Sequence, residues 1–108
     1  MERRWSPRQK FPRMISLECE GLGRINAQAH DISMEGMYIE TDGRPLRHNT
    51  RVRTHFEMEA NGISQRYSID GRIVHKDERG AGIMFRQLDV RLCRQLHDVL
   101  YPEDRPAA

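Results

Sequence analysis

The sequence predicts a small antiparallel β-barrel followed by one α-helix. Three patterns support this prediction: short runs of alternating apolar and polar residues, turn residues between those runs, and an apolar stripe with helical spacing near the carboxyl end. A chain of 108 residues has the size of one domain. We expect a flexible basic arm at residues 1–13, the barrel at 14–86, the helix at 87–102 and a disordered tail at 103–108.

The strands are predicted from six runs that alternate with a period of two, at residues 14–20, 24–32, 36–41, 51–58, 63–74 and 81–85. Asn61-Gly62 is a strong two-residue hairpin signal. Gly71 indicates a bulge or bend inside the fifth run, and Asp70-Gly71 is also compatible with a turn. Six short strands separated by turns are typical of a small antiparallel barrel.

The last element has helical periodicity. Its apolar residues recur at steps of three and four: Leu88, Leu92, Leu96, Val99 and Leu100. Asp89 is a suitable N-cap, and Pro102 ends the helix. We expect the stripe to pack on the barrel or to cover one of its open ends.

Composition argues against several classes of function. The chain has no run of about 18 apolar residues and no secretory signal, so no membrane insertion is expected. Cys19 and Cys93 are isolated at apolar positions, which favours reduced core thiols in a cytoplasmic protein. The five histidines form no ligand cluster, and no catalytic constellation is visible. We therefore expect no enzyme activity, no bound metal and no cofactor.

Positive charge is concentrated in the arm. It holds one acid, Glu2, against five basic residues: Arg3, Arg4, Arg8, Lys10 and Arg13. Two prolines interrupt any helix there. Trp5 is the single tryptophan of the chain and lies between two of the arginines. A solvated basic terminus with Trp5 packed on the core is the simpler interpretation of this segment.

The stretch Asp31-Ile32-Ser33-Met34-Glu35-Gly36 connects the second and third predicted strands. Taken alone, it is explained by turn chemistry, because Asp and Ser bond nearby backbone and Gly permits a positive φ. Beside Arg4 and Arg8 it also suits a small anionic guanine nucleotide. Arginine donates to phosphate and to guanine O6 and N7, and a carboxylate accepts from guanine N1–H and N2–H.

The pair Arg4-x-x-x-Arg8 followed by Asp31-x-Ser33-x-x-Gly36 resembles the motifs of the PilZ domain family. Members of this family are bacterial receptors for the second messenger cyclic di-GMP. Three further segments are similar to the family pattern: Gly71-Arg72-Ile73-Val74, Gly82-Ile83-Met84-Phe85 and Leu88-Asp89. The resemblance spans roughly residues 3–101 and implies a six-stranded antiparallel barrel with a C-terminal helix.

The resemblance also implies roles for individual residues. Arg4 and Arg8 would clamp guanine edges and phosphates, and Arg3 would help to hold phosphate. In the corner, Asp31 would read guanine, Ser33 would bond the ligand and Gly36 would keep the corner open.

Two further residues are candidates for the site. Trp5 would cover the ligand or only anchor the arm. His75 stands where some members of the family carry an aromatic residue, so it is a candidate for stacking, although an exposed strand histidine is the simpler interpretation.

The function implied is that of a stand-alone receptor for cyclic di-GMP, which relays the signal to an unidentified effector protein as the arm becomes ordered. One alternative is a PilZ-like protein-interaction module that binds no nucleotide, but such members usually lack the arginines or the Asp-Ser-Gly set. Another is a barrel for single-stranded nucleic acid. Aromatic residues make up only 6% of the chain and its net charge is +2, so neither DNA nor RNA is expected as a partner.

Overall fold

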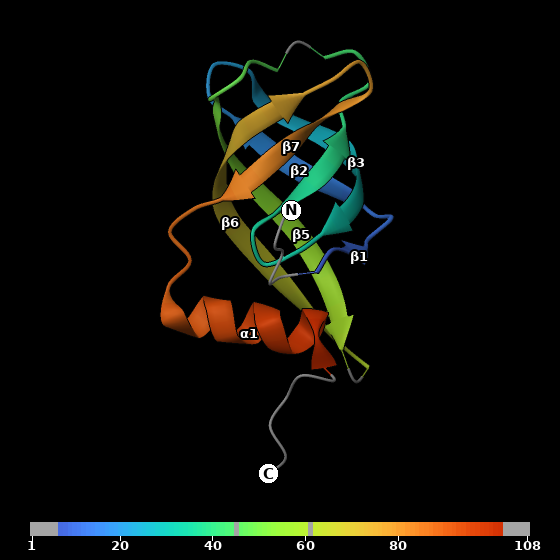
Figure 1. The fold of residues 1–108 in the computed structure, drawn as a ribbon, viewed down its shortest axis with the longest axis vertical. Helices are drawn as coiled ribbons and strands as arrows, with labels where there is room; N and C mark the ends of the chain where they lie inside the picture. Colours follow the sequence, from blue (N-terminus) through green and yellow to red (C-terminus); the bar gives the residue numbers. More distant parts are fainter. Residues whose placement is uncertain (1–6, 45, 61, 103–108) are drawn as a thin grey trace, which may run out of the picture.

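The computed structural model describes residues 7–44, 46–60 and 62–102, and within them the predicted fold class is confirmed. A closed antiparallel barrel stands above one helix (Figure 1). The elements are β1 (Gln9–Lys10), β2 (Met14–Cys19), β3 (Gly23–Ile32), β4 (Gly36–Glu40), β5 (Arg51–Ala60), β6 (Ile63–Lys76), β7 (Gly80–Phe85) and α1 (Val90–Leu100).

The barrel closes at β4, a strand of five residues. The sheet runs in the order β1-β3-β2-β5-β6-β7-β4, and β4 pairs with β3 as well as with β7. Closure leaves the strands β2 to β7 without an open edge among themselves, which protects their backbone hydrogen bonds. The strand β1 is added outside this ring, on β3.

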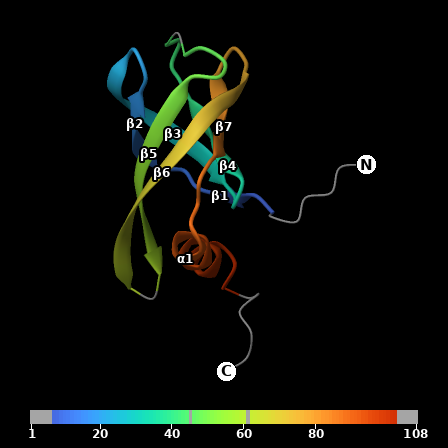
Figure 2. The same ribbon diagram turned by 90° about the vertical axis from the view of Figure 1, so that its left-hand side faces the viewer.

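The core consists of the inward-facing residues of the barrel and of one face of α1. Leu17, Ile39 and Ile73 are fully buried inside the barrel, and Leu96 is fully buried beneath it. Figure 2 shows α1 below the barrel and beside the long β5–β6 hairpin. The predicted leucine stripe therefore covers one end of the barrel.

The helix begins where its cap was predicted, because Leu92 N donates to Asp89 Oδ1 over 2.7 Å. It is shorter than the predicted range 87–102, since Gln87 has a φ of +57°, outside the helical region, and the caps Asp89 and Tyr101 flank the helix. Cys19 is buried as expected, whereas Cys93 is only half-buried on α1. Among the described residues, no helix has both the length and the apolar character that crossing a bilayer requires.

The second half of the arm differs from the expected irregular segment. Gln9 and Lys10 pair with β3, and Phe11 N donates to His30 O over 2.8 Å. The Phe11 ring is buried and meets the Phe56 ring edge-on, with 5.6 Å between their centroids. This apolar anchor explains why the arm adds a strand here. Predictions for residues 1–6 and 103–108 fall outside the described residues.

The fifth predicted strand is continuous through Asp70-Gly71, so no turn forms there. The irregularity lies slightly later, where the pairing of β6 with β7 shifts between Ile73 and His75. Gly71 instead marks a close approach, because a Cβ at this position would meet Ile83 Cγ2 at 2.7 Å.

Two glycines set how closely β4 and β7 approach each other. A Cβ at Gly36 would collide with the carbonyl oxygen of Ile83, and one at Gly80 would collide with the carbonyl oxygen of Ile39. Gly82 is different, since its Cβ would meet only the Cβ of His75, at 3.4 Å. The closure of the barrel therefore requires glycine at two positions of this strand pair and tolerates a larger residue at the third.

We predict that Gly36→Ala lowers the free energy of unfolding by at least about 2 kcal/mol, because backbone must move to admit the methyl group. Gly82→Ala is the matched control and should change it by less than about 1 kcal/mol. Urea denaturation followed by circular dichroism measures both. Equal losses in the two variants would contradict the close-approach explanation.

Candidate functional site

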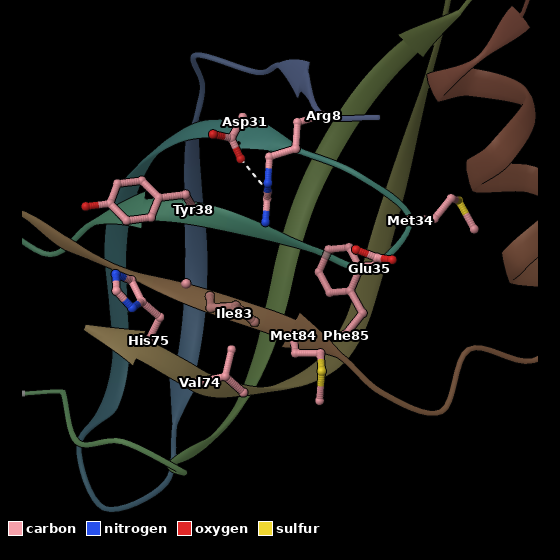
Figure 3. Close-up of a pocket in the computed structure, with 11 residues that line it drawn as sticks. Arg8, Asp31, Met34, Glu35, Tyr38, Val74, His75, Ile83, Met84 and Phe85 are labelled. Carbon is pink, nitrogen blue, oxygen red and sulfur yellow. Dashed lines mark hydrogen bonds and ion pairs between the residues drawn. The ribbon is translucent and has the colours of Figure 1, made fainter. Parts of the chain in front are cut away.

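A hollow of about 680 Å³ lies on the outer face of the barrel, where β3, β4, β7 and β6 are neighbours. Figure 3 shows Arg8 and Asp31 on one side of it and the rings of Tyr38 and His75 nearby. Its remaining lining comes from the β3–β4 corner and from the strands below: Met34, Glu35, Val74, Gly82, Ile83, Met84 and Phe85.

Two β-bulges turn residues toward this hollow. The pairing of β3 with β4 shifts between Ala29 and Asp31, and the pairing of β6 with β7 shifts between Ile73 and His75. Strict alternation would point Asp31 and His75 into the barrel, like Ala29 and Ile73, which are fully buried. A bulge supplies one extra residue and changes the direction in which the next side chains point. Asp31 and His75 consequently face outward.

The structure brings together Arg8 and Asp31, which are 23 positions apart. Arg8 Nη1 donates to Asp31 Oδ1 over 2.5 Å, as the dashed line in Figure 3 marks. The pairing of Lys10 with Asp31 in the β1–β3 ladder carries the arm to this point. The side chains remain 36% and 30% exposed, so this ion pair is open to water and to a ligand.

The rest of the predicted corner faces inward. Ser33 is fully buried, its Oγ accepts a hydrogen bond from Glu35 N at 3.1 Å, and its own amide donates to Gly36 O. These bonds shape the turn that carries Glu35 to the hollow. Gly36 lies against the backbone of Ile83. Direct ligand contacts of Ser33 and Gly36 stay predictions, while the observed geometry gives both residues a positioning role.

Tyr38 lines the hollow, although sequence reasoning assigned it no role. Its hydroxyl donates to Asp77, with the two carboxylate oxygens at 2.8 and 2.9 Å. Burial and the Asp77 carboxylate raise the pKa of Tyr38. The same hydroxyl, with the amides of Gly80 and Arg79, lowers the pKa of Asp77. In the sequence, the signal that could have identified Tyr38 is an aromatic residue at an outward-facing position of the strand that follows the β3–β4 corner.

His75 lies close to the same carboxylate. Its Nε2 is 3.8 Å from Asp77 Oδ2, and its side chain is 65% exposed. Figure 3 shows His75 on the same side of the hollow as Tyr38. The predicted stacking candidate therefore stands beside an aromatic ring that the sequence did not single out. Arg3, Arg4 and Trp5 lie outside the described residues.

Tyr101 joins three parts of the chain at the end of α1. Its hydroxyl donates to Pro7 O over 2.7 Å and accepts from Met34 N over 3.3 Å. The arm, the β3–β4 corner and the C-cap of the helix thus meet at one side chain. In the part of the chain that the structure describes, no group of three or more His, Cys, Asp or Glu residues is arranged to hold a metal ion.

Comparisons with solved structures identify the fold. The PilZ domain of YcgR from Escherichia coli, solved with c-di-GMP, has a TM-score of 0.75 at 16% identity over 94% of this chain and 91% of that chain. The PilZ domain of CeSA from a cellulose-synthesizing bacterium has a TM-score of 0.62 at 12% identity, covering 90% and 99%. The inhibitor of motility MotI/DgrA from Bacillus subtilis has a TM-score of 0.72 at 11% identity, covering 95% and 51%.

Sequence comparison supplies the family. No curated protein matches the chain significantly. The model of the PilZ domain family, in contrast, matches residues 2–101, which include both motifs and the whole barrel with its helix. The chain belongs to the PilZ domain family.

Proposed function

We propose that this protein is a receptor for cyclic di-GMP, which binds in the hollow between the arm and the outer face of the barrel. The observation that carries the proposal is the ion pair between Arg8 and Asp31 at the edge of that hollow. These residues belong to the two separate family motifs, and each offers chemistry that guanine can use. The bound nucleotide of the YcgR PilZ domain supports the same ligand class.

The ligand would exchange partners with this ion pair. Guanine O6 and N7 would accept from Arg8, and guanine N1–H and N2–H would donate to Asp31. An exposed ion pair contributes only about 0–1 kcal/mol, whereas each hydrogen bond to a charged group contributes about 1.5–3 kcal/mol. Replacing the pair therefore costs less than the new contacts contribute. Arg3 and Arg4 would donate hydrogen bonds to the phosphates of the dinucleotide.

The signal would pass from the ligand to an unidentified effector protein through the arm. A nucleotide that holds Arg4 and Arg8 against the barrel creates a combined surface of arm and ligand for the partner to bind. The contacts of Tyr101 support this relay, because they connect Pro7 next to Arg8 with Met34 and the end of α1. The receptor would act in the cytoplasm, as a binding protein rather than an enzyme.

We predict that Arg8→Ala weakens binding of cyclic di-GMP at least roughly tenfold, or about 1.4 kcal/mol, in isothermal titration calorimetry. The matched control is Arg24→Ala, which removes an arginine of β3 that pairs with Glu18 outside the hollow. This control should bind with unchanged affinity. Equal affinity of the Arg8 variant and the wild type would remove Arg8 from the site.

We predict that cyclic di-GMP changes the fluorescence of Trp5, the single tryptophan, with the same midpoint as the binding heat. Binding of the nucleotide to Arg4 and Arg8 alters the surroundings of the residue between them. Heat without a fluorescence change would separate Trp5 from the ligand. Absence of both at saturating nucleotide would favour the interaction module that binds no nucleotide.

A further inference from the structure

A second hollow, of about 330 Å³, lies on the outer face of the barrel, where β5, β6 and the end of β7 are neighbours. We call it the arginine hollow. It is lined by Arg51, Val52, Asp70, Gly71, Arg72, Arg86 and Gln87. None of these residues lines the hollow beside Arg8 and Asp31, so the two hollows are separate candidate sites.

Strand pairing brings three arginines to this hollow. Arg51 lies directly opposite Arg72 in the β5–β6 ladder. Arg86 follows β7, and its amide donates to Asp70 O over 2.8 Å, which holds it beside the same part of β6. Arginines from three neighbouring segments of the chain therefore line one small space.

The positive charge of the three arginines is not compensated by the protein. Asp70 is the one acid among the lining residues, and its carboxylate accepts from Arg53 Nε over 2.8 Å. Within the described part of the chain, no carboxylate pairs with any of the three. Arg72 Nη1 donates to the neutral carbonyl of Asn49 at 3.2 Å, and its Nε is buried without a partner among the described residues. Because like charges directly opposite each other in a ladder are destabilising, the cluster by itself lowers the stability of the fold.

The donors of the arginine hollow match a phosphate group. A guanidinium can donate two parallel hydrogen bonds to the oxygens of one phosphate. Donors from three segments of the chain suit a tetrahedral oxyanion better than a planar carboxylate, which has only two oxygens. A phosphate group also carries up to two negative charges, so it offsets more of the positive charge than a carboxylate does. Gln87 adds a neutral side-chain amide to the lining.

We infer that the arginine hollow binds a doubly charged phosphate group through Arg51, Arg72 and Arg86. The inference goes beyond the proposed function, because it assigns a second ligand to a different part of the barrel. The phosphate is either the free inorganic ion or a group carried by another molecule as a monoester. Its binding relieves the repulsion between the opposed Arg51 and Arg72.

Nuclear magnetic resonance tests the site by titration with inorganic phosphate, with sodium chloride adjusted to keep the ionic strength constant. The side-chain Nε–H signals of the three arginines should shift together and saturate with one midpoint. Arg51→Gln and Arg86→Gln should each weaken this binding at least about threefold. The matched control is Arg66→Gln, which removes an exposed arginine of β6 outside the arginine hollow and should leave the midpoint unchanged. Shifts that do not saturate, or an equal loss in the control, would overturn the inference.

Thermal melts supply a second readout and confirm that the variants fold. Without phosphate, Arg51→Gln should raise Tm, because it removes one of two opposed like charges. Phosphate should then raise the Tm of the wild type more than that of Arg51→Gln, since a ligand stabilises only the protein that binds it. An equal increase in both proteins would show a general salt effect and would count against the site.

Three further probes separate the possible ligands. Acetate at the same ionic strength should shift the arginine signals less than phosphate does; an equal effect would favour an acidic protein segment and overturn the phosphate site. Binding of both O-phosphoserine and inorganic phosphate would support a group carried by another protein, whereas binding of inorganic phosphate alone would support the free ion.

Cyclic di-GMP should bind Arg51→Gln as it binds the wild type. A loss of nucleotide affinity equal to that of Arg8→Ala would assign the arginine hollow to the nucleotide and overturn the second site, while the receptor stands. If the wild type binds phosphate but no cyclic di-GMP, the receptor falls and the phosphate site stands.

Discussion

The close contact of β4 with β7 is the constraint on which the rest of the structure depends. β4 has five residues, and it must pair with β3 on one side and β7 on the other to close the barrel. Gly36 and Gly80 make this possible, because carbonyl oxygens of the facing strand occupy the places where their Cβ atoms would lie. A longer strand would close the barrel through many cross-strand contacts. The short β4 instead depends on two close approaches, at its own Gly36 and at Gly80 of β7.

Closing the barrel also fixes the outer face. Met37 and Ile39 are fully buried, so the period of two in a strand turns Tyr38 outward. The same register sets Tyr38 between Asp31 and Gly82. A slip of one residue would expose the buried pair and would remove Tyr38 from the hollow. The hydrophobic core therefore specifies the geometry of the candidate site.

The sequence was sufficient for features that depend on local periodicity, and for the family. Alternation located the strands, and Asp89 marked the start of α1. The two bulges were not predicted, because a polar residue at the inward position of Asp31 or His75 is also typical of a strand that ends there, and only the pairing shows that the strand goes on with one extra residue. The β1 strand depends on Phe11 reaching Phe56, a contact between distant segments. Tyr38 reaches the hollow through cross-strand register, which the order of residues alone does not give.

The contacts of the arm differ in how easily a ligand could replace them. Phe11 is buried against Phe56, and burying a phenylalanine contributes about 1.5–3 kcal/mol, so the arm is fixed there. The Arg8–Asp31 pair is partly exposed and contributes far less. A nucleotide that takes Arg8 from Asp31 can thus rearrange the chain before Phe11 without disturbing the barrel. Pro7, the residue before Arg8, accepts a hydrogen bond from the Tyr101 hydroxyl. A rearrangement of the arm at Arg8 would therefore reach the end of α1.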